Sequence, residues 1–296
     1  MVLSSVLCIS DLNGTNASSL HSDFLEPTMF EVPLWFEDIP NMPWLWSVIG
    51  SILVGLTGVL PVFFMDVEEV GSMGKGVVSN KLKTILSFAV GALLADVFLH
   101  SLPEIYTINA SNAGSQQASG MLILCGLITF IALEKMLGSF EVDEKRVSGY
   151  LNLLANVIDN FTHGLSLGGA FLVSPSLGVL TTIAILVHEI PHEVGDFAIL
   201  LRSGLTRWEA AGFQLFTAGG GLVGAIFAIV CSGASNSIEA RTSWILPFTA
   251  GSFLHIGLVT VLPDLLKEES PTESFKQMCS FIVGIMLISI VGNIFE

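Results

Sequence analysis

Eight separate stretches of this chain are predominantly apolar, and this feature constrains the fold more than any other. A helix needs roughly 20 apolar residues to cross a bilayer. Lipid offers no partner to open backbone groups, and the alternation typical of barrel strands is absent, so each stretch is expected to be a helix. The sequence therefore predicts an all-α polytopic membrane protein with eight transmembrane helices, at residues 44–64, 83–103, 118–138, 151–174, 177–201, 210–232, 244–266 and 274–294.

Charge agrees with a membrane setting. Only 12% of the residues are charged, against about a quarter in soluble proteins. The net charge of -15 argues against nucleic acid as a partner, because phosphates need basic residues. The 4 cysteines are too scattered for a disulfide framework or a cysteine-based zinc site. The expected partners are the lipid bilayer and small ligands.

The basic residues predict an orientation. Of the 11 Lys and Arg residues, only Arg241 lies beyond an even-numbered span. Basic residues mark the cytosolic side, so both termini are expected outside the cytosol. Residues 1–43 then form an acidic lumenal or extracellular tail, and residues 44–296 form the transmembrane domain. The remaining bases are Lys75, Lys81, Lys83, Lys135, Lys145, Arg146, Arg202, Arg207, Lys267 and Lys276.

Three Asn-X-Ser/Thr sequons lie on that same non-cytosolic side. They begin at Asn13, Asn16 and Asn109. Such sequons are glycosylation acceptors in secreted segments. Their shared side favours a glycoprotein in a secretory-pathway membrane.

Spans four and five carry ionisable side chains, which are costly in lipid and usually functional. Asp159 and His163 are four residues apart and share a helical face, as do His188 and His192. Imidazole, carboxylate and amide oxygen together suit zinc or iron(II). The predicted metal site consists of Asp159, Asn160, His163, His188, Glu189, His192 and Glu193.

The segment HEIPH, residues 188–192, also matches the HExxH signature of zinc metalloproteases. In that alternative, Glu189 is the general base of an intramembrane protease. Pro191 counts against it, because proline removes a helical hydrogen bond and is expected to kink the helix between the two histidines. A second polar helix, span four, also supplies more ligands than a protease needs.

Spans two and seven repeat a pattern. Residues 96–104 read DVFLHSLPE and residues 255–266 read HIGLVTVLPDLL, so both end in Leu-Pro-acid. The charge count gives the two spans opposite directions, and inverted correspondence is typical of transporters with a site at the midplane. In span six, Gln214 could reach that site. Gly164 and Gly168 in span four indicate close helix packing.

These residues resemble the ZIP (Zrt/Irt-like) family of metal transporters. Residues 188–204, HEIPHEVGDFAILLRSG, resemble the HExPHExGD signature of the LIV subfamily. The resemblance implies a bundle of inverted three-helix repeats around spans four and five, and a metal site that is often binuclear, with His192 as a bridging ligand. It implies transport of divalent metal ions without a catalytic cofactor, and a homodimer. By the same resemblance, Asp96, His100, Asp196, His255 and Asp264 line the approaches.

One departure bears on the metal. Most of the subfamily has HNxxD in span four, whereas this chain reads DNFTH at residues 159–163. The reversed pair resembles the ZIP-thirteen branch, which is associated with the early secretory pathway (Golgi or endoplasmic reticulum) and, in insects, with iron. The resemblance therefore implies Fe(II) or Zn(II) as the bound and transported ion. The long histidine-rich loops of many relatives are missing.

Overall fold

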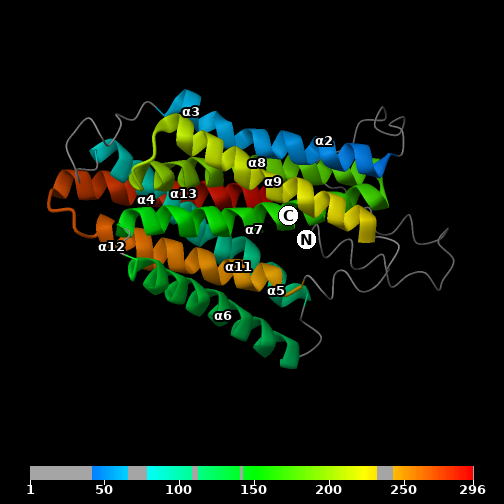
Figure 1. The fold of residues 1–296 in the computed structure, drawn as a ribbon, viewed down its shortest axis with the longest axis horizontal. Helices are drawn as coiled ribbons and strands as arrows, with labels where there is room; N and C mark the ends of the chain where they lie inside the picture. Colours follow the sequence, from blue (N-terminus) through cyan, green and yellow to red (C-terminus); the bar gives the residue numbers. More distant parts are fainter. Residues whose placement is uncertain (1–41, 66–78, 109–112, 141–142, 232–242, 296) are drawn as a thin grey trace.

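A computed structural model describes residues 42–65, 79–108, 113–140, 143–231 and 243–295. Figure 1 shows long helices that run back and forth along the longest axis of the bundle. The described elements are α2 (Pro43–Leu56), η2 (Thr57–Val59), α3 (Leu60–Phe64), α4 (Asn80–Ala95), η4 (Asp96–Ser101), α5 (Leu102–Ile108), α6 (Ala113–Gly138), α7 (Glu144–Val173), α8 (Pro175–Arg202), α9 (Arg207–Cys231), α11 (Ile245–Leu254), η6 (His255–Val261), α12 (Leu262–Leu265) and α13 (Pro271–Phe295).

The all-α polytopic fold is confirmed, while the count of eight spans stays a prediction. In the described part of the chain, 7 helices are long and apolar enough to cross a membrane. The predicted fourth span lies in α7, which is 30 residues long but is not among those 7. Its polar face, which includes Asn152, Asn156 and Asp159, lowers its apolar character. The same residues that suggest function therefore weaken the membrane signal of this helix.

The predicted spans at 118–138 and 151–174 leave residues 139–150 as a connection, and this expectation is wrong in its second half, which is helical. Helix α7 begins at Glu144, so its first two turns are built from residues expected in a loop. The Asp143 carboxylate caps the helix by accepting a hydrogen bond from the Lys145 backbone N–H at 3.1 Å. Apolar length marks only the part of a helix inside lipid, so it missed this polar extension.

The helices pack in two sets. Helices α2, α7, α8 and α9 contact one another, α4 packs against α13, and α6 packs against α11. Helix α8 also packs against α4 and thereby joins the sets. The predicted close packing is confirmed where α7 crosses α9: a Cβ on Gly164 would run into the Gly221 carbonyl, and one on Gly224 into the Phe161 carbonyl. The polar faces of α7 and α8 therefore meet inside the protein.

The two Leu-Pro-acid segments share a local structure. In each, a helix widens into π-helical turns, η4 or η6, and an α-helix restarts at the Leu before the Pro. Pro103 and Pro263 lack an N–H, so the turn before each loses a regular hydrogen bond. Wide turns of this kind often lie at functional sites. The local correspondence is confirmed, and the inverted three-helix repeats stay a prediction.

The described basic residues lie at or near the ends of helices that gather at one end of the bundle, the left end in Figure 1. This end, where α4, α7, α9 and α13 begin and α6 and α8 end, is called the basic end below. Lys75, Arg241 and the three sequons lie outside the described residues. So does almost all of the predicted tail. The described bases are Lys81, Lys83, Lys135, Lys145, Arg146, Arg202, Arg207, Lys267 and Lys276.

Candidate metal site

Asp96 meets two histidines of α8 where α4 widens into η4. Its Oδ1 lies 3.2 Å from His188 Nε2 and 3.7 Å from His192 Nε2. The two imidazole rings are four residues apart on α8, with centroids 4.8 Å apart. The three donor atoms lie within 4.8 Å of one another. One carboxylate and two imidazoles at this spacing match the donor set of zinc or iron(II).

A second donor group joins α7 to α8. His163 Nε2 lies 3.2 Å from Glu189 Oε2 and 3.4 Å from Asp159 Oδ2. His163, His188 and Glu189 offer three donor atoms within 4.8 Å of one another. His188 therefore belongs to both groups. Asp96, His163, His188, Glu189 and His192 are called the histidine cluster below.

The donor atoms of this cluster are buried without hydrogen bonds. In the described part of the chain, Asp96 Oδ1, His163 Nε2, Glu189 Oε2 and His192 Nε2 have no hydrogen-bond partner. Burying such groups unpaired costs several kcal/mol, and two carboxylates in one cluster repel each other. A divalent cation held between them would offset both costs. The site therefore fits a metal ion better than a structural polar network.

Three other residues predicted around this site have hydrogen-bond partners outside the donor groups, Asn160 within α7 and Glu193 and Gln214 across α8 and α9. The Asn160 side chain donates to the Asn156 carbonyl at 3.1 Å and contacts the Asn156 side-chain amide. Glu193 Oε2 accepts a hydrogen bond from Gln214 Nε2 of α9 at 2.5 Å. Gln214 therefore contacts a residue of the predicted site, and its place on the pathway stays a prediction. As metal ligands, Asn160 and Glu193 stay predictions, as does the bridging role of His192, because the donor shared here is His188.

Two of the predicted approach residues adjoin the cluster on opposite sides. The His100 ring lies 5.1 Å from the His188 ring, and its Nε2 lies 3.8 Å from Glu104 Oε2. Since α4 begins at the basic end, His100 and Glu104 lie beyond Asp96 toward the other end. Asp196, in contrast, is one turn past His192 toward the basic end, and accepts from Asn156 Nδ2 at 2.5 Å.

The other two approach residues have partners elsewhere. His255 is fully buried, and its Nε2 lies 2.6 Å from Glu134 Oε2 of α6. Asp264 pairs with the guanidinium of Arg202, which also donates to Ser148 Oγ at 3.2 Å. The structure does not bring His255 or Asp264 to the donor atoms, so an approach role for either rests on the resemblance alone.

The basic end is closed by charged contacts. Arg202 is buried and joins α7, α8 and η6 through Ser148 and the Thr260 carbonyl, to which it donates at 3.1 Å. Outside the spans, Lys83 donates to Glu268 at 2.8 Å and holds the pKa of that carboxyl below its ordinary value. A guanidinium at this place repels cations, so an ion that leaves this way must pass Arg202.

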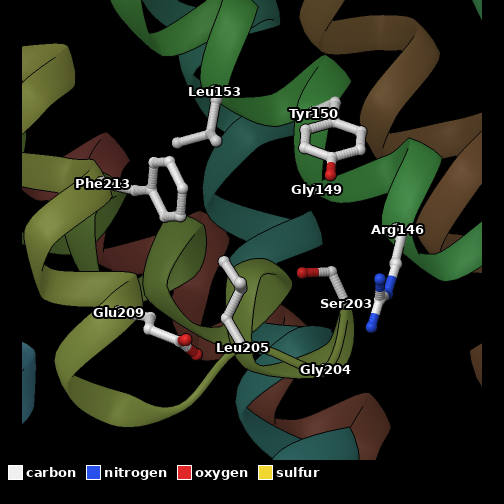
Figure 2. Close-up of a pocket in the computed structure, with 9 residues that line it drawn as sticks. All are labelled: Arg146, Gly149, Tyr150, Leu153, Ser203, Gly204, Leu205, Glu209 and Phe213. Carbon is white, nitrogen blue, oxygen red and sulfur yellow. The ribbon is translucent and has the colours of Figure 1, made fainter.

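Figure 2 shows a cavity of about 300 Å³ at the same end, between the start of α7, the α8–α9 connection and the start of α9. Arg146 and Tyr150 lie on one wall, and Leu205 and Phe213 lie across from them. Its one carboxylate, Glu209, already accepts from the Thr206 N–H at 2.8 Å. The cavity is therefore a poor cation site.

Sequence reasoning underestimated some of these residues. Asp96 was expected only on an approach, yet it faces two histidines directly. Its i,i+4 spacing to His100 was the available signal, but no local pattern shows that α4 packs on α8. Glu134, the partner of His255, and the buried Asn152 went unnoticed because only the packing of the helices shows what their side chains face.

These features define a class: a polytopic membrane protein with a buried metal-ion site. The ZIP zinc transporter family matches residues 138–292. The chain is 42% identical to the zinc transporter ZIP13 homolog of Drosophila melanogaster, over 94% of this chain and 96% of that protein. It is 52% identical to zinc transporter ZIP13 of Pongo abelii, over 83% of this chain and 77% of that protein. For zinc transporter ZIP13 of Homo sapiens the identity is 45%, over 83% and 80%. The chain belongs to the ZIP family, in the branch that contains the ZIP13 proteins.

Proposed function

We infer that this protein carries divalent transition-metal ions across a membrane. One observation carries the inference: two groups of metal-donor side chains that share His188 lie where η4, α7 and α8 meet, and the helices over residues 80–107 and 175–202 are long and apolar enough to cross a membrane. Membership of the ZIP family supports it. A resident structural ion would need only one closed set of ligands, whereas two overlapping sets give a mobile ion a place to move.

The shared donor suggests how an ion moves. The ion is bound first by Asp96, His188 and His192. It then passes to His163 and Glu189 while His188 remains a ligand. Each group offers three protein donors, so the hydration shell is replaced only in part and release stays easy. We place the group on η4 first because His100 and Glu104 lie beyond Asp96, on the side away from the basic end.

The protease alternative is not supported. Glu189, its required base, faces His163 of α7 at 3.2 Å and belongs to a donor group. The family matched by the chain consists of transporters. We assign no bond-breaking step to the site.

Flux through purified protein in liposomes tests the proposal. Zn(II) and Fe(II), the latter under reducing conditions, are supplied outside, and an indicator inside reports their arrival. We expect saturable uptake of at least one ion by the natural sequence. Uptake no faster than in protein-free liposomes, with folded protein in both orientations, would contradict the proposal.

We propose that the ion is iron(II) at least as readily as zinc. The reversed DNFTH order supports this, because it moves the carboxylate one helical turn, about 6 Å, toward the basic end. Asp159 then lies on the side of Asn160 and Asn156, where the donors are oxygens. Oxygen-rich sites tolerate six-coordinate iron(II), while zinc prefers fewer ligands with nitrogen or sulfur.

We also propose an early secretory membrane, Golgi or endoplasmic reticulum, with both termini lumenal. The basic end then faces the cytosol. Protease should spare tags at both termini in sealed microsomes, and Asn109 should accept glycan. A C-terminal tag cleaved from the cytosolic side would contradict this topology.

The outer face of α6 fits lipid or a second copy of the chain. Met121, Leu124 and Ile128 are exposed there, and α6 packs mainly on α11. Following the family resemblance, we propose a homodimer within the bilayer. Cross-linking in native membranes should give a band at twice the monomer mass, and a monomer alone would count against it.

A further inference from the structure

Polar side chains continue from the histidine cluster toward the basic end, and they change in kind. Asn160, Asn156 and Asn152 follow one another at four-residue spacing on α7, and Asp196 of α8 faces them. These four residues are called the amide column below. All four are buried, and none is a histidine.

Asn152 is the anomaly in this column. Its side chain is only 1% exposed, and it lies beside the Asp196 carboxylate. Neither its amide nitrogen nor its oxygen has a partner at ordinary hydrogen-bond geometry among the described residues, although the Asp196 carboxylate lies near enough to interact with the amide. A buried amide left unpaired costs about 1–3 kcal/mol, and an apolar residue would avoid that cost.

Asp196 also lacks a compensating charge. Its Oδ2 accepts a hydrogen bond from Asn156, which leaves the carboxylate a second oxygen. In the part of the chain that the structure describes, no Lys, Arg or His side chain lies within 4 Å of it, since His192, one turn away, pairs with Asp96. A buried carboxylate is usually paired or bound to a metal.

We propose that Asp196 and Asn152 form an oxygen-donor site for a divalent cation, distinct from the histidine cluster and one to two helical turns nearer the basic end. Asn156 is its positioning residue, because it fixes one oxygen of Asp196. The inference rests on the proposed function, since the ion reaches this site from His163 and Glu189. Carboxylate and amide oxygens suit manganese(II) and magnesium, and they give zinc less advantage than imidazole nitrogens do, with water as the remaining ligands.

Such a site would assist release. An ion bound by imidazole nitrogens moves to weaker, harder donors before it meets Arg202. An oxygen site narrows the difference in affinity between zinc and iron(II) relative to the imidazole donors, so it would favour iron(II) in comparison with the cluster. The column thus gives the pathway a selectivity step beyond the histidine cluster.

Manganese(II) binding to the purified full chain tests this site. Pulsed electron paramagnetic resonance separates manganese(II) with imidazole nitrogen ligands from manganese(II) with oxygen ligands alone. In the double variant His188→Ala, His192→Ala we expect the nitrogen signal to fall to the level that His163 alone can give and an oxygen-only signal to remain. Adding Asp196→Asn should weaken that remaining binding by about 10-fold or more.

Asn152→Leu is the sharper variant, because an unpaired amide replaced by an apolar group of similar size should leave the fold intact or stabilise it. We expect unchanged or higher thermal stability and about 10-fold weaker oxygen-only binding. The matched control for Asp196→Asn is Glu134→Gln, which also neutralises a carboxylate within a span. It should leave the oxygen-only binding unchanged.

The outcomes separate the two claims. Folded Asn152→Leu protein that binds oxygen-coordinated manganese(II) as tightly as the natural sequence would overturn the inference, as would absence of any oxygen-only signal in the double variant. Liposome flux of the natural sequence decides the proposed function independently. Flux without the oxygen signal would leave the transporter and remove this second site.

Discussion

The histidine cluster and the amide column differ in chemistry although α7 and α8 contribute to both. In the cluster, imidazole nitrogens and carboxylates face one another at 3.2–3.7 Å. In the column, amides and one carboxylate replace them. All residues of the column are buried, whereas His163 and His188 of the cluster are partly exposed. The difference teaches that one polar helix face can hold donors of graded strength, and that an ion can pass from strong to weak ones.

The partners of the two regions differ as well. The cluster needs a third helix, because Asp96 enters from the wide turns of η4. The column lies between α7 and α8 and ends at Arg202. A change in the packing of α4 on α8 would therefore alter the cluster first and leave the column nearly intact.

The largest effect is expected from His188→Ala. This change removes the donor shared by both groups, so flux should fall by more than about 100-fold. Liposome uptake of Zn(II) and Fe(II) measures it. The matched control is His21→Ala in the predicted tail, which should transport normally. If His188→Ala keeps more than a tenth of the flux, His188 is not the shared ligand.

Glu189→Gln should have the next largest effect. The change keeps the shape of the side chain but removes the charge that faces His163, so metal affinity and flux should fall together by about 10-fold to 100-fold. Isothermal titration of the purified protein measures the affinity. Full metal affinity combined with loss of a peptide-bond hydrolysis activity would instead revive the protease alternative.

The double exchange Asp159→His, His163→Asp tests the boundary between the two regions. It returns the carboxylate to the usual HNxxD position and puts imidazole next to the column. We expect the iron-to-zinc transport ratio to fall by up to about 10-fold, because nitrogen donors favour zinc. Competition uptake in liposomes gives the ratio. An unchanged ratio with active protein would show that the reversal does not set selectivity.

The smallest effect concerns the packing that positions both regions on α7. Gly164→Ala should lower stability by about 1 kcal/mol or more, because its Cβ would run into the Gly221 carbonyl. Gly169→Ala on the same helix meets open space and should be neutral or stabilising. Thermal unfolding in detergent compares them. Equal stability of the two variants would mean that α7 and α9 are not in close contact here.

Much of the cluster could be predicted from the sequence because its ligands repeat at helical spacing. His188, His192 and Glu189 lie within five residues, and Asp159 and His163 are one turn apart. Apolar length likewise predicted the helical fold. The start of α7 could not be predicted that way, because its first two turns are polar and rely on the Asp143 cap.

The remaining residues depend on tertiary contacts that no local pattern encodes. Asp96 lies 92 positions before His188, and only the packing of α4 on α8 joins them. The role of Asn152 is inferred from its buried amide, which lacks a partner at ordinary hydrogen-bond geometry among the described residues. Only the surrounding structure shows this. His255 shows the converse: the family resemblance placed it on the pathway, and its contact is with Glu134.

X-ray absorption at the metal edge of the loaded, purified protein tests the central claim most directly. The account predicts a zinc or iron(II) ion with nitrogen and oxygen neighbours only, about two of them imidazoles, and a lower imidazole contribution in His188→Ala. Sulfur scattering, or an unchanged imidazole contribution when His188 is removed, would contradict the assignment of the ion to the histidine cluster.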